Sequence, residues 1–342
     1  MINIALVGIG RIGLVHAHTI KTKLSSEVNL SLFVDSMSKD LENKAKEYNT
    51  KYSRSFDECL NDKTIDAVLL CTPTNTHTES CIKALKSGKH VFCEKPIATN
   101  IEDHLKVIEA SKKSDKKLMV GFNRRFDHNY KNIKERIDAG DIGKIQMIKL
   151  TNYDSPFPNV EFLKTSGGIY LDLCIHDLDL ISFLTDKNGD EPVELFTWGS
   201  AFLMPELAEF GDVDTAIVSV KMKSGAIANI NTTRFASYGY DQRAEVLGTK
   251  GSLESRNDTP TNVILQNERG VIGDKPFYTF LDRYENAYAE EIKQFVESII
   301  NDKDVPVNAQ DCLPALKMAL AANISLKENI AIGFIEYPIS SS

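Results

Sequence analysis

The sequence lacks the long apolar segments that mark membrane proteins. No run approaches the ~20 apolar residues needed to cross a bilayer. The opening residues, MINIALVGIG, also lack the basic region and the cleavage site of a signal peptide. We therefore expect a cytoplasmic protein that does not bind membranes.

Paired cysteines and an excess of basic residues are missing as well. The 342 residues include six cysteines without a CxxC pair, so neither a structural zinc site nor a disulfide framework is indicated. We expect the cysteines to be small buried side chains. Lys and Arg number 40 against 48 Asp and Glu, a net charge of −8. Because nucleic-acid binding needs a basic face, a small neutral or weakly charged ligand is the better expectation.

The first 120 residues alternate β-branched runs with amphipathic stretches, in a chain long enough for two domains. This alternation predicts a parallel sheet covered by helices on both faces, a doubly wound α/β architecture. The predicted strands are Asn3–Val7, Leu30–Val34, Ala67–Cys71, His90–Cys93 and Leu118–Val120, and the predicted helices begin near Arg11, Lys39, Asn75 and Ile101.

The pattern changes after about Gly121. Longer strand-like runs joined by tight turns predict a second, α+β domain with a large, mostly antiparallel open sheet. We place the domains at residues 1–121 and 122–342, with the last helix able to pack back toward the first domain. The predicted strands are Ile145–Asn152, Glu194–Leu203, Ala216–Met222, Ala226–Thr233 and Asp241–Leu247, and the predicted helices are Tyr170–Leu184, Asn286–Ile300 and Ala309–Lys327.

A GxGxxG pattern occupies Gly8-Ile9-Gly10-Arg11-Ile12-Gly13, between a predicted strand and a predicted helix. The first glycine permits a tight turn, the second lets a pyrophosphate approach the backbone, and the third lets the helix pack on the sheet. The helix N-terminus would bind the pyrophosphate. This context predicts a dinucleotide-binding Rossmann domain; a glycine turn without a ligand is the alternative.

Asp35 ends the second predicted strand, where an acidic residue binds the ribose hydroxyls of NAD. Its carboxylate would repel the 2′-phosphate of NADP, and no arginine follows to bind that phosphate, although Lys39 is near. We therefore predict NAD as the cofactor. The alternative is that Asp35, or equally Ser38, caps the next helix.

No metal site is predicted. His16 and His18 resemble a ligand pair, but residues two apart on a helix face different directions. Helical ligand pairs use spacings of three or four.

Several motifs in order resemble those of the glucose–fructose oxidoreductase/inositol dehydrogenase/rhizopine catabolism (Gfo/Idh/MocA) family. The resemblance covers nearly the whole chain and is greatest to the family's inositol 2-dehydrogenases. Its landmarks are Gly8–Gly13, Thr72–His77 (TPTNTH), Glu94-Lys95-Pro96, Gly121–Asp127 (GFNRRFD), Gly167-Gly168 with Asp172 and His176, and Ala244–Gly251 (AEVLGTKG).

The resemblance implies a homotetramer built on the open face of the second sheet, and it implies site residues. The catalytic residues would be Lys95, Asp172 and His176. The cofactor would be bound by Gly8, Gly10, Arg11, Ile12, Gly13, Asp35, Thr72, Pro73, Asn75, His77, Glu94 and Lys95.

The residues themselves support part of this assignment. Asp172 and His176 are four apart in the predicted helix Tyr170–Leu184, and Asp179 is three further on, so all three share one face. A histidine, whose unperturbed pKa is about 6.5, suits a general base. A solvated acidic stripe with an incidental histidine would give the same pattern.

The expected reaction is oxidation of a ring hydroxyl of myo-inositol, or of a close isomer, to the ketone. His176 accepts the hydroxyl proton, Lys95 stabilises the developing oxyanion and Asp172 orients them, while the hydride passes to NAD. Without its motif, Lys95 would be interpreted as a solvated surface charge.

Further polar residues are candidates for binding the other hydroxyls, although each is equally well explained as an ordinary loop or core residue. They are Asn123, Arg124, Asp154 and Tyr238 or Tyr240. Two alternatives remain: a dehydrogenase of another cyclic polyol or an aldose, and a non-catalytic dinucleotide-sensing regulator. The presence of Lys95, Asp172 and His176 together argues against the regulator.

Overall fold

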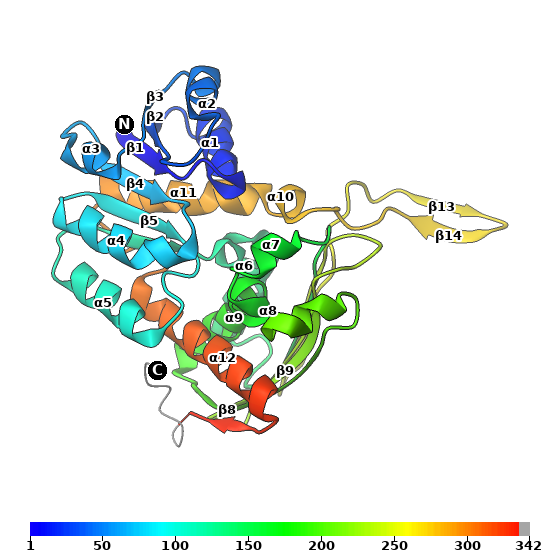
Figure 1. The fold of residues 1–342 in the computed structure, drawn as a ribbon. Helices are drawn as coiled ribbons and strands as arrows, with labels where there is room; N and C mark the ends of the chain where they lie inside the picture. Colours follow the sequence, from blue (N-terminus) through cyan, green and yellow to red (C-terminus); the bar gives the residue numbers. More distant parts are fainter. Residues whose placement is uncertain (335–342) are drawn as a thin grey trace. The chain divides into compact units, whose positions relative to one another are not determined.

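The computed structural model describes residues 1–334, which form two compact units (Figure 1). The first unit contains Met1–Phe126 and Glu285–Leu313, and the second contains Asp127–Tyr284 with residues 314–334. Residues 285–313 thus belong to the first unit, whereas the sequence division places them in the second domain. An amphipathic pattern shows that a helix has an apolar face, but not which sheet that face covers.

The first unit contains a six-stranded sheet in the order β3-β2-β1-β4-β5-β6, with every neighbouring pair parallel. Strands β4 and β6 are wholly buried, as expected when helices cover both faces of the sheet. The sheet confirms the predicted doubly wound architecture and adds the short β3. The strands are β1 Ile2–Val7, β2 Val28–Val34, β3 Lys51–Ser53, β4 Ala67–Leu70, β5 His90–Glu94 and β6 Leu118–Gly121.

The connections between these strands run in opposite directions from β1, toward β3 on one side and β6 on the other. Right-handed crossovers then place the helices on opposite faces. Accordingly α4 packs beside α5 and α1 beside α11. The helices are α1 Arg11–Lys23, α2 Leu41–Tyr48, α3 Phe56–Asn61, η1 Thr74–Thr76, α4 His77–Lys86, α5 Ile101–Lys112, η2 Asn123–Phe126 and α11 Glu285–Ile300.

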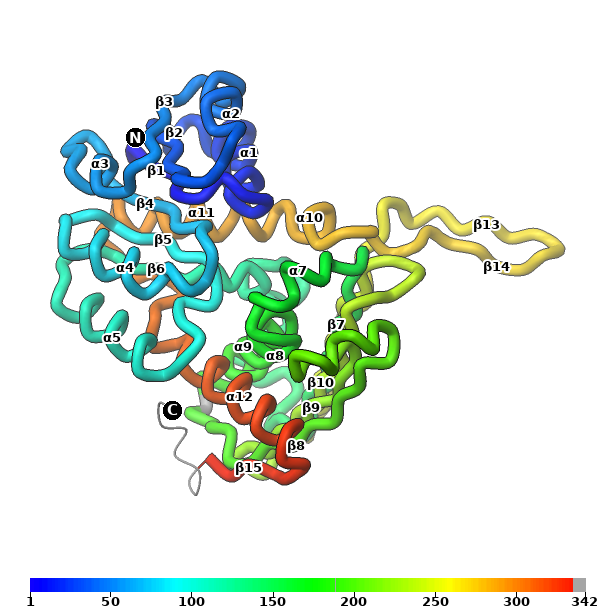
Figure 2. The backbone as a smooth tube through the Cα atoms, in the orientation of Figure 1, coloured from blue at the N-terminus to red at the C-terminus, as the bar shows by residue number. Residues whose placement is uncertain are grey.

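The second unit contains a seven-stranded sheet in the order β12-β11-β7-β10-β9-β8-β15. All pairs are antiparallel except β7 with β10, which confirms the predicted mostly antiparallel sheet. A separate hairpin, β13–β14, extends away from this sheet (Figure 2). The strands are β7 Ile145–Tyr153, β8 Pro192–Ser200, β9 Thr215–Met222, β10 Ile227–Thr233, β11 Asp241–Gly248, β12 Gly251–Ser255, β13 Ile264–Asn267, β14 Gly270–Gly273 and β15 Ile332–Gly333.

The remaining helices belong to the second unit, except that α12 begins in the first. Asp127 caps α6 by accepting hydrogen bonds from two backbone N–H groups, and Gly140 ends the helix in the left-handed conformation. These helices are α6 His128–Ala139, α7 Val160–Leu163, α8 Gly168–Asp172, α9 Ile175–Thr185, η3 Asp186–Asn188, η4 Pro205–Phe210, α10 Phe280–Arg283 and α12 Ala309–Glu328.

The prediction of one continuous helix over Tyr170–Leu184 is wrong. Helix α8 ends at Asp172, and α9 begins at Ile175. At the break, the N–H of Cys174 donates to the carbonyl of Ile169, five residues back, which interrupts the regular ladder. Asp172 and His176 therefore lie on opposite sides of a helix break, and their spacing of four no longer guarantees a shared face.

The predicted burial of the cysteines is confirmed. All six are buried and none forms a disulfide bond, namely Cys59, Cys71, Cys81, Cys93, Cys174 and Cys312. None of the described helices is long and apolar enough to cross a membrane.

Candidate active site

The glycine motif forms the turn between β1 and α1. Gly8 has a φ of +90°, and a Cβ there would lie 2.6 Å from the carbonyl oxygen of Cys71. A Cβ on Gly13 would lie 2.0 Å from the carbonyl oxygen of Gly8. Both glycines are therefore required by packing of the protein itself.

Gly10 differs from both. It is exposed, its φ is an ordinary −68°, and no described atom lies within 4 Å of a Cβ built on it. The protein alone does not need glycine here, so the open space fits a pyrophosphate at the N-terminus of α1. Arg11 and Ile12 follow in the first turn of that helix, exposed and half-buried respectively.

Asp35 follows β2 and is oriented by three backbone N–H groups. Its Oδ2 accepts a hydrogen bond of 3.0 Å from Ile9, in the glycine motif, and its Oδ1 accepts bonds of 2.8 Å from Met37 and Ser38. The alternative that Asp35 or Ser38 caps the next helix is wrong, because α2 begins at Leu41 with Asp40 at its N-cap. The fixed carboxylate next to the glycine turn is suited to binding ribose hydroxyls.

His77 connects the loops that follow β4 and β5. Its Nδ1 lies 2.8 Å from the carbonyl oxygen of Pro96, and its Nε2 lies 2.8 Å from that of Thr72. Both ring nitrogens face the protein, so a direct hydrogen bond to a nucleotide would require one of these contacts to break. Burial lowers the pKa of His77, against the opposing effect of the two carbonyls. Pro73 and Asn75, in the same loop, are exposed.

Lys95 lies directly after β5, where the strand ends at Glu94. The Lys95–Pro96 peptide is cis, the lysine is half-buried, and Glu94 is buried. Because β5 pairs with β4 and β6, the backbone is fixed up to the residue before the lysine. Asn123 and Arg124 follow β6, the next strand of the sheet, and both are buried.

In the second unit, Asp172 accepts a hydrogen bond of 2.9 Å from Nη1 of Arg234, directly after β10. The other end of the guanidinium, Nη2, donates to Asp212 over 3.0 Å. Asp212 in turn accepts from the N–H of Ile169, at the start of α8. Arg234 is almost completely buried, so this ion-pair network fixes the end of α8 that carries Asp172.

Helix α9 is buried on nearly all sides, which differs from the predicted polar face. Asp177 and Asp179 are both buried, while His176 in the first turn is half-buried. The carboxylate of Asp177 accepts a hydrogen bond of 2.5 Å from the amide of Asn152 in β7, which also accepts one from Gln242. These polar contacts attach α9 to the sheet.

Two other predicted substrate residues lie at the same end of that sheet. Asp154 follows β7; its N–H donates to the carbonyl of Thr233, and its own carbonyl accepts from Ala236. Tyr238 is 40% exposed, and its hydroxyl donates to Asp241. Burial and the Asp241 charge raise the pKa of Tyr238. Tyr240 is instead a core residue beside Tyr284.

The site residues therefore form two groups, one in each unit. The first follows the carboxyl ends of β1, β2, β4 and β5 and includes the glycine turn, Asp35 and Lys95. The second contains Asp154, Asp172 and His176. The meeting of Lys95 with Asp172 and His176 stays a prediction.

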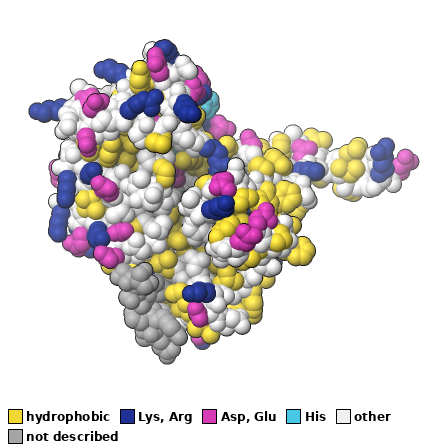
Figure 3. All heavy atoms as spheres, viewed as in Figure 1, with side chains coloured by type: hydrophobic (Ala, Val, Ile, Leu, Met, Phe, Trp, Pro, Cys, Tyr) yellow, Lys and Arg dark blue, Asp and Glu magenta, His cyan; other side chains and the backbone are white. Residues whose placement is uncertain are grey.

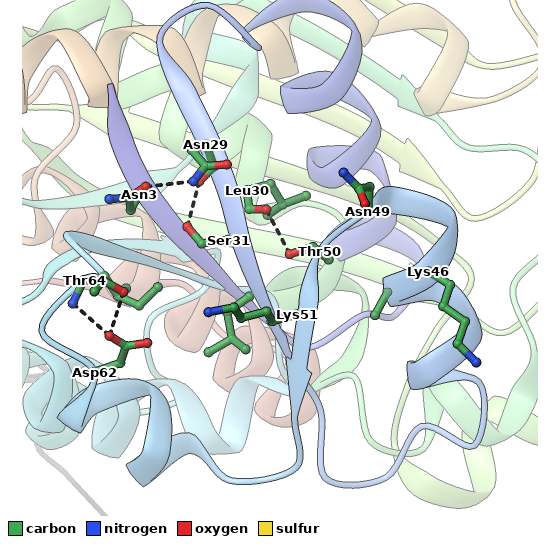
Figure 4. Close-up of a pocket in the computed structure, with 13 residues that line it drawn as sticks. Asn3, Asn29, Leu30, Ser31, Lys46, Asn49, Thr50, Lys51, Asp62 and Thr64 are labelled. Carbon is green, nitrogen blue, oxygen red and sulfur yellow. Dashed lines mark hydrogen bonds between the residues drawn. The ribbon is translucent and has the colours of Figure 1, made fainter.

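A surface hollow of about 720 Å³ lies elsewhere in the first unit (Figure 4). It lies near the amino-terminal parts of β1 and β2, lined by Asn3, Asn29 and Lys51 among others. In doubly wound sheets the nucleotide binds at the opposite, carboxyl ends, so this hollow is not the expected cofactor site.

Comparison with known proteins agrees with the two-unit architecture. The profile described as "Oxidoreductase family, NAD-binding Rossmann fold" matches residues 2–122, and "Oxidoreductase family, C-terminal alpha/beta domain" matches residues 134–332. The chain belongs to the Gfo/Idh/MocA oxidoreductase family, and its first unit carries the family's NAD-binding domain.

Relatives match over almost their whole length. The chain is 40% identical to a myo-inositol 2-dehydrogenase of Thermotoga maritima, covering 96% of this chain and 97% of the relative. The structure of a myo-inositol dehydrogenase from Corynebacterium glutamicum superposes with a TM-score of 0.90 at 32% identity, covering 97% and 98% of the two chains. A scyllo-inositol dehydrogenase from Lactobacillus casei with bound NAD(H) and scyllo-inositol gives 0.90 at 32% identity, covering 98% and 99%.

The sequence analysis missed Arg234 and Asp212. Arg234 lies 62 residues after Asp172, and Asp212 lies 22 residues before Arg234. No local spacing connects them, since the sheet brings them together. The available signal is an arginine directly after a strand whose other residues alternate between buried and exposed.

Proposed function

We propose that the protein is an NAD-dependent inositol dehydrogenase that oxidises one ring hydroxyl to a ketone. The observation that carries the proposal is the presence of Lys95, Asp172 and His176 in a chain similar over 96% of its length to a myo-inositol 2-dehydrogenase. Bound NAD would accept the hydride from the reacting carbon.

Residues of the chain accept the proton, stabilise the oxyanion and orient the substrate. His176 accepts the hydroxyl proton as general base, and the Lys95 ammonium stabilises the oxyanion that develops as the carbon loses its hydride. Asp172, fixed by Arg234, orients the substrate hydroxyl and the two partners. The alcohol becomes a ketone, one hydride reduces the nicotinamide, and one proton leaves through His176.

Each unit supplies candidate residues for the other hydroxyls. Asp154 and Tyr238, together with Asn123 and Arg124, are proposed to recognise hydroxyl positions around the ring. The relatives include both a myo- and a scyllo-inositol dehydrogenase, so stereochemistry varies on one fold. We propose myo-inositol as substrate because the myo-inositol 2-dehydrogenase shows the higher identity.

The test is turnover by the purified protein with NAD and a panel of myo-, scyllo- and D-chiro-inositol and glucose, followed at the NADH absorbance. We expect the highest kcat/KM for myo-inositol and a large loss in His176→Ala. His18→Ala, at an exposed histidine of α1, is the matched control and should keep full activity. Turnover of glucose but no inositol would select the aldose alternative, whereas NAD binding without any turnover would select a dinucleotide sensor.

We also propose that the enzyme is a homotetramer. One face of the second sheet exposes apolar side chains that are direct cross-strand neighbours: Met147 opposite both Ile227 and Leu247, and Trp198 opposite Ile217. Hydrophobic side chains are also exposed on the β13–β14 hairpin (Figure 3). A contiguous exposed apolar surface is typical of an interface. Light scattering that gives a monomer mass would refute the assembly.

The six buried cysteines, none of which forms a disulfide bond, fit a reducing compartment, so we propose that the enzyme works in the cytoplasm. Fractionation of the native cells, with a cytoplasmic enzyme as marker, tests this location. Recovery outside the cytoplasm would contradict it.

A further inference from the structure

Three titratable side chains meet in the interior of the first unit: His16 of α1, Glu94 at the end of β5 and Glu291 of α11. Nε2 of His16 lies 2.7 Å from Oε1 of Glu94. One nitrogen or oxygen atom from each of the three residues lies within 4.8 Å of the others, and all three residues are buried. Glu94 is among the residues expected to bind the cofactor, whereas His16 and Glu291 have no part in the expected dinucleotide site or in the proposed proton transfer.

Glu291 is the unusual member. Its side chain is fully buried, and neither carboxylate oxygen has a hydrogen-bond partner among the described residues. The titratable groups near it include Glu94, His16 and the thiol of Cys71. Helix α11, which carries Glu291, also packs against η2, where the charged residues are Arg124 and Arg125. An ionised carboxylate in such a place is costly, and two carboxylates in one buried site cannot both ionise cheaply.

One protonation pattern accounts for these contacts. Full burial beside a second carboxylate favours the neutral acid form of Glu291. The same burial, reinforced by the charge of Glu94, raises the pKa of Glu291 well above its usual value. His16 then donates from Nε2 to the Glu94 carboxylate. Its Nδ1, which has no partner among the described residues, is a bare lone pair rather than a buried N–H.

A divalent cation is the other group that such a cluster can hold. Ligand atoms about 2.0–2.2 Å from one ion lie about 3 Å or more from each other. Nε2 of His16 and Oε1 of Glu94 are 2.7 Å apart, which is a hydrogen-bond distance. The observed geometry therefore favours a proton over a metal ion.

The cluster lies next to the predicted catalytic lysine. Glu94 immediately precedes Lys95, and its side chain is held by His16. Pro96 immediately follows Lys95, and its carbonyl is held by His77. The lysine thus stands between two residues that are each anchored by a buried histidine.

We propose that Glu291 is a positioning residue for Lys95, which rests on the proposed function of the enzyme. As a buried neutral acid close to Glu94 and His16, it leaves Glu94 as the ionised carboxylate of the cluster, and His16 holds that carboxylate in the residue next to the lysine. Replacement of the acid by an apolar side chain changes the polarity around the Glu94 carboxylate and lets Glu94 and the adjoining lysine move. Ionisation of Glu291 adds a second negative charge that repels the Glu94 carboxylate.

The kinetic test compares Glu291→Met, Glu291→Gln and Glu297→Met. Glu297 is exposed on the same helix, so its substitution by methionine is the matched control. We expect Glu291→Met to lower kcat about tenfold with little change in the KM for NAD, because small misplacements of a catalytic group are costly. Glu291→Gln, which keeps the size and polarity of the neutral acid but cannot ionise, should recover most of the loss and move the alkaline limb of the kcat profile to higher pH.

Two measurements do not require catalytic turnover. They therefore test the role of Glu291 even if the proposed inositol dehydrogenase activity is wrong. The infrared difference spectrum between wild type and Glu291→Gln should contain the carbonyl band of a protonated carboxylic acid. Acylation of Lys95 by an amine-reactive ester, measured by mass spectrometry relative to Lys86, should change in Glu291→Met and not in Glu297→Met.

The pH dependence of the free energy of unfolding is a further test of the raised pKa of Glu291. The folded pKa of Glu291 is raised, so its stabilising contribution is complete below the ordinary value of 4.5 and is lost as pH rises toward the folded value. The free energy of unfolding of wild type relative to Glu291→Gln should therefore fall as pH rises above 4.5. The proposal would be overturned if the difference in unfolding free energy between wild type and Glu291→Gln did not depend on pH, or if the infrared band of the acid were absent. A metal ion bound to the purified protein would also overturn it, as would equal kcat and equal Lys95 acylation in Glu291→Met and Glu297→Met.

Discussion

The two units hold their site residues by different means. In the first, Asp35 and Lys95 directly follow strands, and residues of neighbouring strand-end loops hold them: Ile9 of the glycine turn contacts the Asp35 carboxylate, and His77 contacts the Pro96 carbonyl beside Lys95. In the second, Asp172 depends on Arg234, which is 62 residues away. Parallel strands bring their carboxyl ends to one edge, so motifs at the strand ends meet there, whereas the second site depends on sheet pairing and a helix break.

The largest expected effect comes from Lys95 in the first unit. Lys95→Ala should lower kcat about 10³-fold, because it removes the cation that stabilises the oxyanion, while thermal unfolding changes little. Steady-state kinetics with myo-inositol and NAD measures the effect. Lys86→Ala, at an exposed lysine of α4, is the control. A loss of only a few-fold would show that Lys95 does not have this role.

Arg234 should behave in the opposite way, with stability and activity lost together. Arg234→Met leaves Asp172 and Asp212 without their shared cation, which should lower the free energy of unfolding by about 3–5 kcal/mol. Denaturant unfolding measures the loss. Arg256→Met removes an exposed arginine paired with Glu254 and should leave the free energy of unfolding almost unchanged, because solvent screens exposed ion pairs. Equal losses in the two variants would remove the contrast between the units.

Alanine substitutions at two glycines of one motif should have different effects, one on stability and the other on NAD binding. Gly8→Ala forces a left-handed φ and a 2.6 Å approach to the Cys71 carbonyl, so it should destabilise the protein by about 2 kcal/mol or more. Gly10→Ala meets nothing within 4 Å and should leave unfolding within about 0.5 kcal/mol of wild type. It should nevertheless raise the KM for NAD. If Gly10→Ala binds NAD normally, the pyrophosphate does not approach Gly10.

The smallest expected effect concerns Asp35. Asp35→Asn removes the charge that repels a 2′-phosphate and weakens the bonds to the ribose, so the ratio of NAD to NADP efficiency should fall about tenfold. Ser38→Ala, in the same turn, should leave the ratio unchanged. An unchanged ratio in Asp35→Asn would assign cofactor selection to another residue, and the ratio of kcat/KM values is the measurement.

The parts predicted well from sequence are those with local causes. The β-branched runs identified five of the six strands of the first sheet within one or two residues at either end. They missed β3, whose three residues are too few for a pattern. The single helix predicted over Tyr170–Leu184 failed because a regular apolar period runs through the break at Leu173 and Cys174.

The cluster of His16, Glu94 and Glu291 shows a second limit. Sequence spacing excluded His16 and His18 as a pair, and the structure has the first buried and the second exposed. Spacing could not reveal the partners of His16, because they come from β5 and α11. The return of residues 285–313 to the first unit brings Glu291 there, and no local pattern encodes that return.

The amino-acid sequence by itself determined the glycine turn and the fold class, because each depends on residues adjacent in the chain and on periodicities of two or 3.6. The family motif predicted the role of Lys95. Only the tertiary structure decided that Arg234 holds Asp172 and that Glu291 lies beside Glu94. Both contacts bury charged or acidic groups, which are stable in the interior only with the right partner, and the pairing of distant strands and helices selects that partner.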